Sequence, residues 1–420
     1  MQLFNRTLKD LALISEKQIL DGLNNDEFVY YYQPKISLIT GKVIGAEALI
    51  RWIKPEGQII QPQEFIPLAE QTGILSAITY KMFAKLARDL LIFSDIDSAL
   101  VISFNTSAQD FVEPDFRRMV LDTLSQLRIP ARCLQIEITE NTVLHADAAI
   151  KKNILTLCNK GMGLAMDDYG TGYATLETLS QWPFSTIKLD KSIVSRMLDS
   201  SKHQTITESS IRMAHELDIS VVAEGVESEM QYQMLLEAGC TKVQGFWLSR
   251  PLPLDDFIYF IDQDLRWSGL PIGLIHMAVV DHIQWRKRLV SDVVRMSTTN
   301  AQQGVLEQAN IFTLPIDHRD CRLGKWYYGV GKQFKDCPYF SAIEAPHEKF
   351  HQLGRQLILI ASHGGSMHEL TPLLTEFSDC SAVILDCLQK LEQKGLVDMH
   401  NAHQAWIEHH LFSPAQPYKR

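Results

Sequence analysis

The chain has 420 residues, of which 46% are hydrophobic, so it is long enough for a large core and for two domains. A net charge of −10 without a long basic run argues against a nucleic-acid polymer as partner, and any phosphate must be bound by local positive groups. Seven scattered cysteines, and no apolar stretch near the ~20 residues that span a bilayer, predict a cytoplasmic protein without a membrane segment.

The order of the apolar segments predicts an α/β fold. Residues 1–25 carry a loose apolar stripe that indicates a helix, with residues 1–15 as an extension before the first domain. Two strands, 28–35 and 44–52, follow each other too closely for a helix between them, so we expect an antiparallel pair. Strands and helices then alternate, as they do in a parallel barrel. We expect the later strands at 99–104, 134–138, 164–166, 186–189, 221–225 and 242–243, and helices at 62–72, 75–93, 146–160 and 205–217.

Two adjacent carboxylates, Asp167 and Asp168, follow the predicted strand 164–166. Parallel barrels carry their chemistry at the C-terminal ends of their strands, and Gly170 and Gly172 allow a sharp turn there. Neighbouring carboxylates repel each other in a partly dry site unless positive charge holds them, and a pair of divalent cations is the usual solution. A solvated turn is the simpler explanation of this motif when it stands alone.

Other predicted strands carry polar side chains of the same kind near their ends. Their oxygens suit hard cations such as Mg²⁺ or Mn²⁺, which in turn suit phosphate oxygens. Lys188 and Arg51 are the positive charges that the pattern places beside them. A single acidic strand end is more often a cap for the next helix or a surface residue, but this does not explain so large a set, and we predict a two-metal phosphodiester hydrolase. The set comprises Asn105, Glu137, Asp167, Lys188, Glu224 and Gln244.

Two motifs carry a resemblance to a known family. Glu47-Ala48-Leu49 and Asp167-Asp168-Tyr169-Gly170-Thr171-Gly172 resemble the EAL family of cyclic di-GMP phosphodiesterases. The resemblance covers residues 16–262 and implies a TIM-like (β/α)8 barrel with one antiparallel strand. It also implies hydrolysis of cyclic di-GMP to linear pGpG with two Mg²⁺ or Mn²⁺, and a homodimer formed through the barrel. Supporting segments are Tyr32-Gln33-Pro34, Glu137-Ile138-Thr139-Glu140, Ile187-Lys188-Leu189-Asp190, Ala223-Glu224-Gly225-Val226-Glu227 and Gln244-Gly245-Phe246.

The same resemblance implies roles for single residues. Lys188 and Gln244 would position the attacking water, and Asp167 would bridge the two ions. Glu140 would steady the loop after Asp168 and link dimer contacts to metal occupancy. The substrate would be held by Gln33, Leu49, Arg51 and Asp190. The metal ligands would be Glu47, Asn105, Glu137, Asp167, Asp168 and Glu224, and the catalytic set Glu47, Asp167, Asp168, Lys188 and Gln244.

The chain departs from the family pattern at Tyr169, where Phe is usual, and at Ala174, where Ser is usual. Both positions lie outside the expected metal ligands. The chain also lacks the Gly-Gly-Asp/Glu-Glu-Phe signature of the cyclase partner domain, so synthesis of the nucleotide is not expected. The alternative function is a catalytically silent barrel that binds cyclic di-GMP and signals to a protein partner. Silent sites usually lose a ligand or the lysine, and this chain keeps them all, which favours hydrolysis.

Beyond a predicted linker at 263–273 the composition changes, since 11 of the 14 histidines follow residue 270. His347 and His351 are four residues apart, so on a helix they share one face. Together with Cys321 and His282 they offer four ligands that suit tetrahedral Zn²⁺. The sequence therefore predicts a second metal site, of different chemistry from the first.

These segments resemble the chemoreceptor zinc-binding domain, an all-α bundle with a three-His, one-Cys zinc site, over residues 274–392. His282 is preferred over the rivals His318 and His276 because the pattern Asp281-His282-Ile283-Gln284-Trp285 fits the resemblance. The His-Glu-x-x-His pattern at 347–351 also matches metalloproteases, but a Cys321 thiolate would close the position that a catalytic zinc keeps open. The tail, 393–420, is expected to be either an extra helix or disordered, and its possible metal ligands are His400, His403, His409 and His410.

Overall fold

The computed structural model describes residues 14–412 except 113, 171–175, 268–271 and 300–316. The chain divides into two compact units, one formed by Met1–Leu235 with Thr241–Trp267 and the other by Leu236–Cys240 with Ser268–Arg420. Most of the predicted N-terminal extension, residues 1–15, lies outside the described part of the chain, and α1 begins at Glu16. Along the described part of the chain, no helix combines the length and apolar character needed to cross a membrane.

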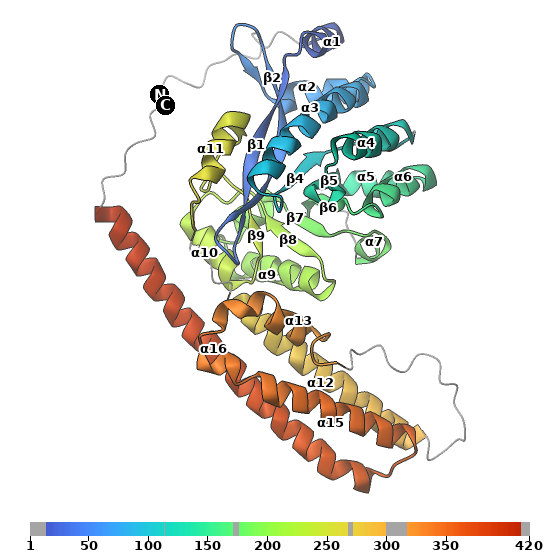
Figure 1. Ribbon diagram of the computed structural model, residues 1–420, viewed down its shortest axis with the longest axis vertical. Helices are drawn as coiled ribbons and strands as arrows, with labels where there is room; N and C mark the ends of the chain where they lie inside the picture. Colours follow the sequence, from blue (N-terminus) through green and yellow to red (C-terminus); the bar gives the residue numbers. More distant parts are fainter. Residues whose placement is uncertain (1–13, 113, 171–175, 268–271, 300–316, 413–420) are drawn as a thin grey trace. The chain divides into compact units, whose positions relative to one another are not determined.

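The first unit is a closed barrel of eight strands surrounded by helices (Figure 1). The pairs from β2 through β9 around the barrel are parallel, whereas β1 runs antiparallel to both β2 and β9. This confirms the predicted barrel with its one antiparallel strand. The barrel strands are β1 (Phe28–Ser37), β2 (Val43–Ile53), β4 (Val101–Asn105), β5 (Leu134–Thr139), β6 (Gly163–Tyr169), β7 (Thr186–Leu189), β8 (Ser220–Ala223) and β9 (Lys242–Val243).

Two short strands, β3 (Ile59–Ile60) and β10 (Leu252–Pro253), pair antiparallel with β2 and β1. The predicted helix 146–160 begins later than expected, at Ala148, because the Asp147 carboxylate caps its first turn by accepting from the amides of Ala149 and Ile150. The helices before residue 268 are α1 (Glu16–Asn24), α2 (Pro62–Gln71), α3 (Leu75–Ile96), α4 (Pro114–Leu127), α5 (Glu140–His145), α6 (Ala148–Cys158), α7 (Leu176–Gln181), α8 (Lys191–Arg196), α9 (Ser201–Glu216), α10 (Glu229–Glu237) and α11 (Leu254–Asp262).

Successive side chains on the barrel strands point alternately outward, toward the helices, and inward, into the barrel. Outward residues pack against the helices: the Tyr32 ring stacks on Phe257 of α11 at 5.6 Å and meets Phe93 of α3 edge-on at 5.0 Å. Inward residues are polar, and buried members of this set come from different strands. They include Gln33 and Lys35 of β1, Glu47 of β2, Ser103 of β4, Glu137 of β5 and Lys188 of β7. The closed sheet therefore encloses a polar interior at the level of these residues.

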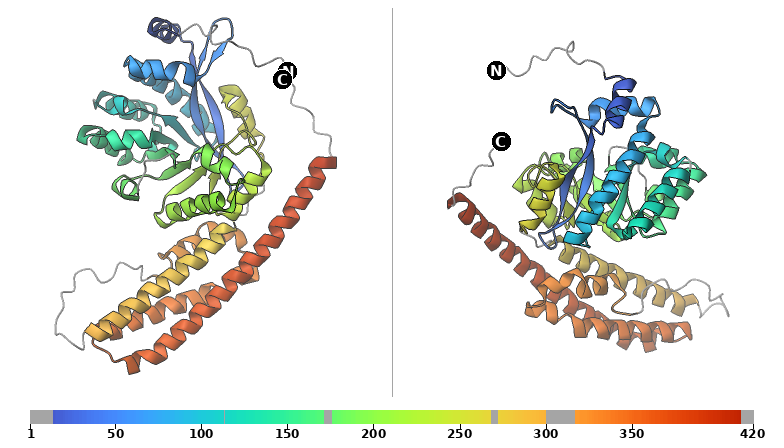
Figure 2. Two further views of the ribbon diagram at one scale, coloured as in Figure 1. Left: turned by 180° about the vertical axis from the view of Figure 1, so that it is seen from behind. Right: turned by 45° about the horizontal axis from the view of Figure 1, so that its top comes forward.

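The second unit is helical, as predicted. Helices α12, α15 and α16 lie side by side in all three views (Figures 1 and 2) and contact one another, with α13 against α12 and α14 against α16. Their core contains the stacked rings of Phe350 and Phe377, with centroids 4.1 Å apart, beside Trp285. The helices are α12 (Gly273–Thr299), α13 (Arg322–Tyr328), α14 (Pro338–Ser341), α15 (Glu344–Ser362) and α16 (Met367–Phe412).

Helix α16 continues without interruption across residue 393, where the sequence suggested that a separate tail begins. The backbone of the predicted tail is therefore helical up to Phe412. The side chains of the four tail histidines lie outside the described part of the chain, so their predicted metal role stays open.

Gly45 provides a test of how tightly β2 and β4 are joined. A Cβ at Gly45 would lie 1.9 Å from the carbonyl oxygen of its partner residue Val101, so Gly45→Ala should force the two strands apart. We expect a loss of about 3 kcal/mol in the free energy of unfolding, measured by urea denaturation. Gly57→Ala is the control because a Cβ there meets nothing within 4 Å, and it should cost only about 1 kcal/mol of backbone strain at positive φ. Equal costs for the two variants would contradict this view of the β2–β4 pair.

Candidate functional site

The Lys188 ammonium group lies at the centre of the first site. It is 1% exposed, and its Nζ lies within ion-pair distance of four carboxylates that come from four different strands or strand ends. The distances are 2.6 Å to Glu137, 2.9 Å to Asp167, 2.9 Å to Glu224 and 3.3 Å to Glu47. One carboxylate oxygen each of Glu47, Glu137 and Asp167 lies within 4.8 Å of the other two, close enough to hold one metal ion.

Glu47 is fixed by two amide side chains in addition to Lys188. Asn105 Nδ2 donates to Glu47 Oε1 at 2.8 Å, and Gln244 Nε2 donates to Glu47 Oε2 at 2.8 Å. Gln244 Nε2 also donates to Gln33 Oε1 at 3.0 Å, so these predicted site residues form one network. Gln244 Oε1 is buried and has no hydrogen-bond partner among the described residues, which leaves an acceptor available for a ligand or water.

A second ammonium group, that of Lys35, reaches the cluster from β1. Its Nζ donates to Glu137 Oε1 at 2.8 Å and to Ser103 Oγ at 2.5 Å, and all three side chains are buried. The sequence placed Lys188 and Arg51 as the positive charges of the site and missed Lys35. Arg51 is half-buried and donates to the backbone carbonyl of Ile50 at 2.8 Å, beside the Tyr31 ring.

Burial and mutual repulsion set the protonation of the cluster. Burial would lower the pKa of Lys188, but the carboxylates, Glu137 first, raise it well above its ordinary value. Burial would raise the pKa of Glu137, and the charges of Lys188 and Lys35 lower it instead. Burial raises the pKa of Glu47, of Asp167 and, to about 8, of Glu224. Two ammonium groups thus do not balance four carboxylates, and one carboxyl keeps a proton near neutral pH unless another cation is supplied.

Asp168 and Asp190 lie at the rim of the site. Asp168 is exposed, at the end of β6, with φ of 55°, and its amide donates to Asp167 Oδ1 at 3.0 Å. Asp190 caps α8 by accepting from the Ser192 amide at 2.9 Å, and its charge adds to the burial that raises the pKa of Asp168. Leu49, another predicted substrate residue, is half-buried on β2 directly opposite Tyr31 of β1.

Glu140 contacts the chain immediately after the paired aspartates. Its carboxylate is buried at the start of α5, and Oε1 accepts from the Gly170 amide at 2.9 Å. Gly170 has φ of +99°, a conformation that glycine adopts without strain. Glu140 is therefore placed to hold the backbone that follows Asp168, as the resemblance implies, while Gly172 and Ala174 lie outside the described residues.

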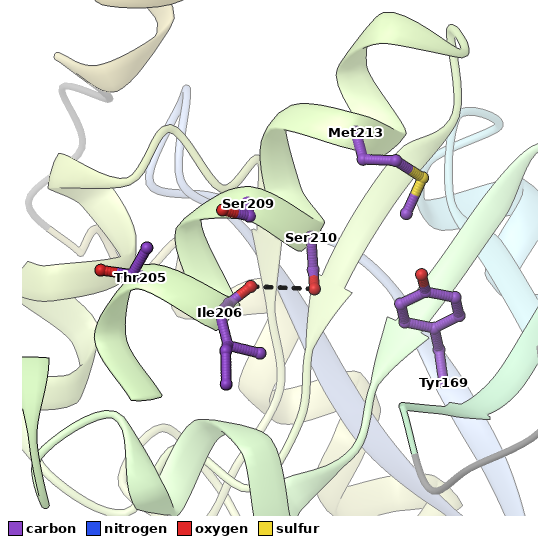
Figure 3. A pocket seen from close by; sticks show the side chains of 6 residues that line it. All are labelled: Tyr169, Thr205, Ile206, Ser209, Ser210 and Met213. Atoms are coloured by element: carbon purple, nitrogen blue, oxygen red, sulfur yellow. Dashed lines mark hydrogen bonds between the residues drawn. The ribbon is translucent and has the colours of Figure 1, made fainter. Parts of the chain in front are cut away.

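The Tyr169 side chain lies beside α9. Its ring faces a pocket of about 320 Å³ on α9, toward Met213 and Ser210 (Figure 3). The other lining residues are Thr205, Ile206 and Ser209. The hydroxyl that distinguishes this chain from the usual Phe therefore lies in the α9 pocket, outside the carboxylate cluster.

The second unit contains a cluster of soft ligands. Cys321, His347 and His351 are buried, and their ligand atoms lie within 4.8 Å of one another. Cys321 Sγ lies 3.3 Å from His347 Nε2 and accepts from the Gly324 amide at 3.2 Å. A side chain at position 324 would collide with the His318 carbonyl oxygen at 1.9 Å, so glycine lets this turn close around the thiol.

His282, the fourth predicted ligand, lies in the same buried region. Its Nε2 is 3.0 Å from Ser381 Oγ, a charge on His351 would lower its pKa, and its own charge would lower the pKa of His347. Of the rivals, His318 Nε2 lies 3.1 Å from the Tyr328 hydroxyl, and the exposed His276 is 3.4 Å from Glu392. Neither rival belongs to the described cluster of three, so the geometry places Cys321, His347 and His351 together and leaves His282 beside them.

Burial governs the charges of this second cluster. It lowers the pKa of His282 to about 3 and that of His347 to about 2, and it raises the pKa of the Cys321 thiol to about 11. Neutral imidazoles are the form that binds metals, whereas the thiol must lose its proton to bind. Two histidine nitrogens and one sulfur fit Zn²⁺, and the oxygens of the barrel cluster fit a harder ion.

The fold and the first cluster define an α/β barrel with an acidic site at the C-terminal ends of its strands. The chain belongs to the EAL domain family, whose model matches residues 16–251. A second model, the chemoreceptor zinc-binding domain, matches residues 282–358. Both matches confirm the families that the motifs indicated.

Relatives match the barrel part of the chain. The signaling protein YkoW of Bacillus subtilis is 36% identical over 60% of this chain and 32% of its own length. The cyclic di-GMP phosphodiesterase RocR of Pseudomonas aeruginosa is 32% identical over 60% of this chain and 64% of its own. The solved structure of the PaMucR phosphodiesterase in complex with c-di-GMP is 31% identical over 57% of this chain and 98% of that chain, with a TM-score of 0.55. This chain thus spans about a third of YkoW and less than two thirds of RocR.

The raised pKa of Glu224 predicts how the stability of the metal-free barrel depends on pH. The ordinary pKa is 4.5 and the folded value about 8, so between them the folded state binds more protons than the unfolded state. This contribution is fully present below about pH 4.5 and is lost as the pH rises toward 8. We expect the melting temperature in EDTA to fall between about pH 7, which lies above the ordinary histidine pKa of about 6.5, and about pH 8.

Thermal denaturation followed by circular dichroism measures this effect. Glu224→Gln removes the titrating group and should flatten the profile, and saturating Mg²⁺ should flatten it in the wild type by replacing the proton. A melting temperature of the metal-free wild type that stays level or rises over this range would show that Glu224 is not held protonated.

Proposed function

We propose that this protein hydrolyses a phosphodiester bond of cyclic di-GMP to give linear pGpG, with two Mg²⁺ or Mn²⁺ in the barrel. The observation that carries the proposal is the ion-pair cluster around Lys188, in which four carboxylates meet one ammonium group. Lys35 adds a second positive charge, so a deficit of positive charge remains among oxygen ligands. Divalent cations would remove that deficit, and hard oxygen ligands favour Mg²⁺ and Mn²⁺.

The proposed ligands are Glu47, Asn105, Glu137, Asp167, Asp168 and Glu224, with Asp167 shared between the ions. When bound, such ions lower the pKa of water and neutralise charge on the attacked phosphate. Lys188 has a raised pKa, so its Nζ stays protonated and would orient the attacking water as a donor. The free acceptor Gln244 Oε1 would take a hydrogen bond from the same water. The two residues would thus fix its direction of attack.

Substrate binding is proposed for residues at the edge of the cluster. Gln33 is held by Gln244 and by its own donation to the Ser249 carbonyl at 3.3 Å, so its position depends on that of the water-orienting amide. Arg51 offers a guanidinium for a phosphate, Asp190 an acceptor and Leu49 an apolar contact. The relatives support this substrate, since the PaMucR structure contains c-di-GMP and RocR is named a cyclic di-GMP phosphodiesterase.

A catalytically silent receptor for cyclic di-GMP is the alternative function. Such a barrel needs nucleotide contacts but no complete set of carboxylates around a charged lysine. Here all six proposed ligands and Lys188 are present, and four of the carboxylates converge on one atom. The hydrolase is therefore favoured over the receptor.

The second unit is proposed to bind one Zn²⁺ through His282, Cys321, His347 and His351 and to regulate the barrel. We also propose a homodimer formed through the barrel, with Glu140 linking the dimer contacts to the site through Gly170. A cytoplasmic location is proposed from the cysteines, because all seven are free thiols, the state that a reducing compartment maintains.

Glu47→Ala tests the hydrolase directly. It removes a carboxylate that contacts Asn105, Gln244 and Lys188. Losing an outer-shell partner of a metal costs up to about 100-fold in activity, and Glu47 is a proposed ligand, so turnover of cyclic di-GMP should fall by more than about 100-fold. Chromatography of nucleotides after incubation with Mg²⁺ or Mn²⁺ measures the product. Glu56→Ala, which alters an exposed carboxylate of the same unit, should retain wild-type turnover.

Normal turnover by Glu47→Ala would refute the site. A wild type that binds but never cleaves the nucleotide would establish the silent receptor.

Cys321→Ala tests the regulatory role of the second unit. Losing the thiol should remove bound zinc and change the rate of hydrolysis, or its response to a zinc chelator, by about 5- to 150-fold, the usual range of allosteric coupling. Elemental analysis and turnover with and without chelator give the two readouts. Cys337→Ala is the matched control, because Cys337 is equally buried in this unit but is not part of the cluster. A variant that loses zinc yet keeps wild-type rates in every condition would make the unit a docking module.

A further inference from the structure

The His282 ring is fixed on two sides inside the helical unit. It lies at 46° to the Phe350 ring, with centroids 4.6 Å apart, and its Nε2 is 3.0 Å from Ser381 Oγ. His282 is 2% exposed and Ser381 is fully buried, so bulk water does not compete for this contact. Because the histidine belongs to α12 and the serine to α16, the contact ties the two helices together.

Arg286 restricts the role that the Ser381 hydroxyl can take. Its Nη1 donates to Ser381 Oγ at 3.2 Å, and a guanidinium group has no acceptor atom. A hydroxyl oxygen has two lone pairs, so one accepts from Arg286 and the other can accept an N–H from His282 Nε2. Arg286 follows His282 by four residues on α12, so both side chains reach the serine from one face of that helix.

Metal binding by His282 needs a partner for the ring nitrogen that does not bind the metal. A histidine ligand uses the lone pair of one ring nitrogen and donates the N–H of the other, and this donation fixes the tautomer and the orientation of the ring. Ser381 Oγ lies at hydrogen-bond distance from Nε2 and can accept that N–H. The Nδ1 lone pair of His282 is then the one left for a metal.

We propose that Ser381 is a positioning residue of the second unit, which holds His282 in the tautomer and orientation that present Nδ1 to Zn²⁺. The inference rests on the proposed zinc site of that unit. Ser381 follows residues 282–358, the part that matches the chemoreceptor zinc-binding domain, so the match itself gives it no role. Its ligands would join α12, the start of α13 and α15, and Ser381 would add α16.

Ser381→Ala tests this inference, because it removes only the hydroxyl and alanine is the best helix former, so α16 should persist. The measurement is the Kd for Zn²⁺ of the full chain, obtained by competition with a chromophoric chelator. Zinc that Cys321→Ala still binds belongs to other sites and is subtracted. We expect the Kd to rise about 10- to 100-fold, the usual effect of losing the outer-shell partner of a metal ligand.

Two comparisons separate the positioning of His282 from a general loss of packing. Cys387→Ala alters another buried side chain of α16 that is not part of the described cluster, so it should keep the wild-type Kd. In a His282→Ala background, Ser381→Ala should change the Kd by less than about twofold, because the serine then has no histidine to hold. Loosened packing would instead weaken zinc binding equally in both backgrounds.

The outcomes distinguish this inference from the proposed zinc site. A Ser381→Ala protein that binds Zn²⁺ at least as tightly as the wild type overturns the role of Ser381, and so does an equal effect in the His282→Ala background. Zinc binding that still depends on Cys321 would leave the proposed site intact in both cases. A wild type whose zinc binding does not depend on Cys321 would refute the site and the inference together.

Discussion

The site depends on the ion pairs that Lys188 makes inside the barrel. A buried ammonium group without partners would cost several kcal/mol, and so would each of the carboxylates around it. Glu47, Glu137, Asp167 and Glu224 come from four places on the closed sheet, so the register of the strands must bring them to one point. The antiparallel β1 strand matters for the same reason, because it carries both Gln33 and Lys35 into the interior.

The two clusters of this chain differ in the charge of their buried side chains. The barrel gathers carboxylates in excess of its ammonium groups, which leaves negative charge that hard cations can balance. The helical unit buries Cys321 and His347 in neutral form beside His351, and nitrogen and sulfur ligands of this kind suit soft or borderline metals. Because the two clusters offer different types of ligand, they suit different ions.

Much of this arrangement could be predicted from the sequence, because strand-helix alternation and polar strand ends are local patterns. The chain order of Asn105, Glu137, Asp167, Lys188 and Glu224 already implied that they meet at one edge of a barrel. Lys35 could not be recognised in this way, since a lysine at the end of a predicted strand usually reaches solvent. Its burial follows from its position two residues after Gln33 on the inward face of β1, which becomes visible only with the register of the pair. The hydrogen-bond partner of Glu140 could not be predicted either, because it is determined by the tertiary structure.

The central claim is that the carboxylates around Lys188 hold two cations beside a bound cyclic dinucleotide. The most direct test is anomalous diffraction from crystals of the full chain grown with Mn²⁺ and cyclic di-GMP. Two manganese peaks among Glu47, Glu137, Asp167 and Glu224, next to a phosphate, are the predicted result. Bound nucleotide with no manganese among these side chains would contradict the two-metal hydrolase.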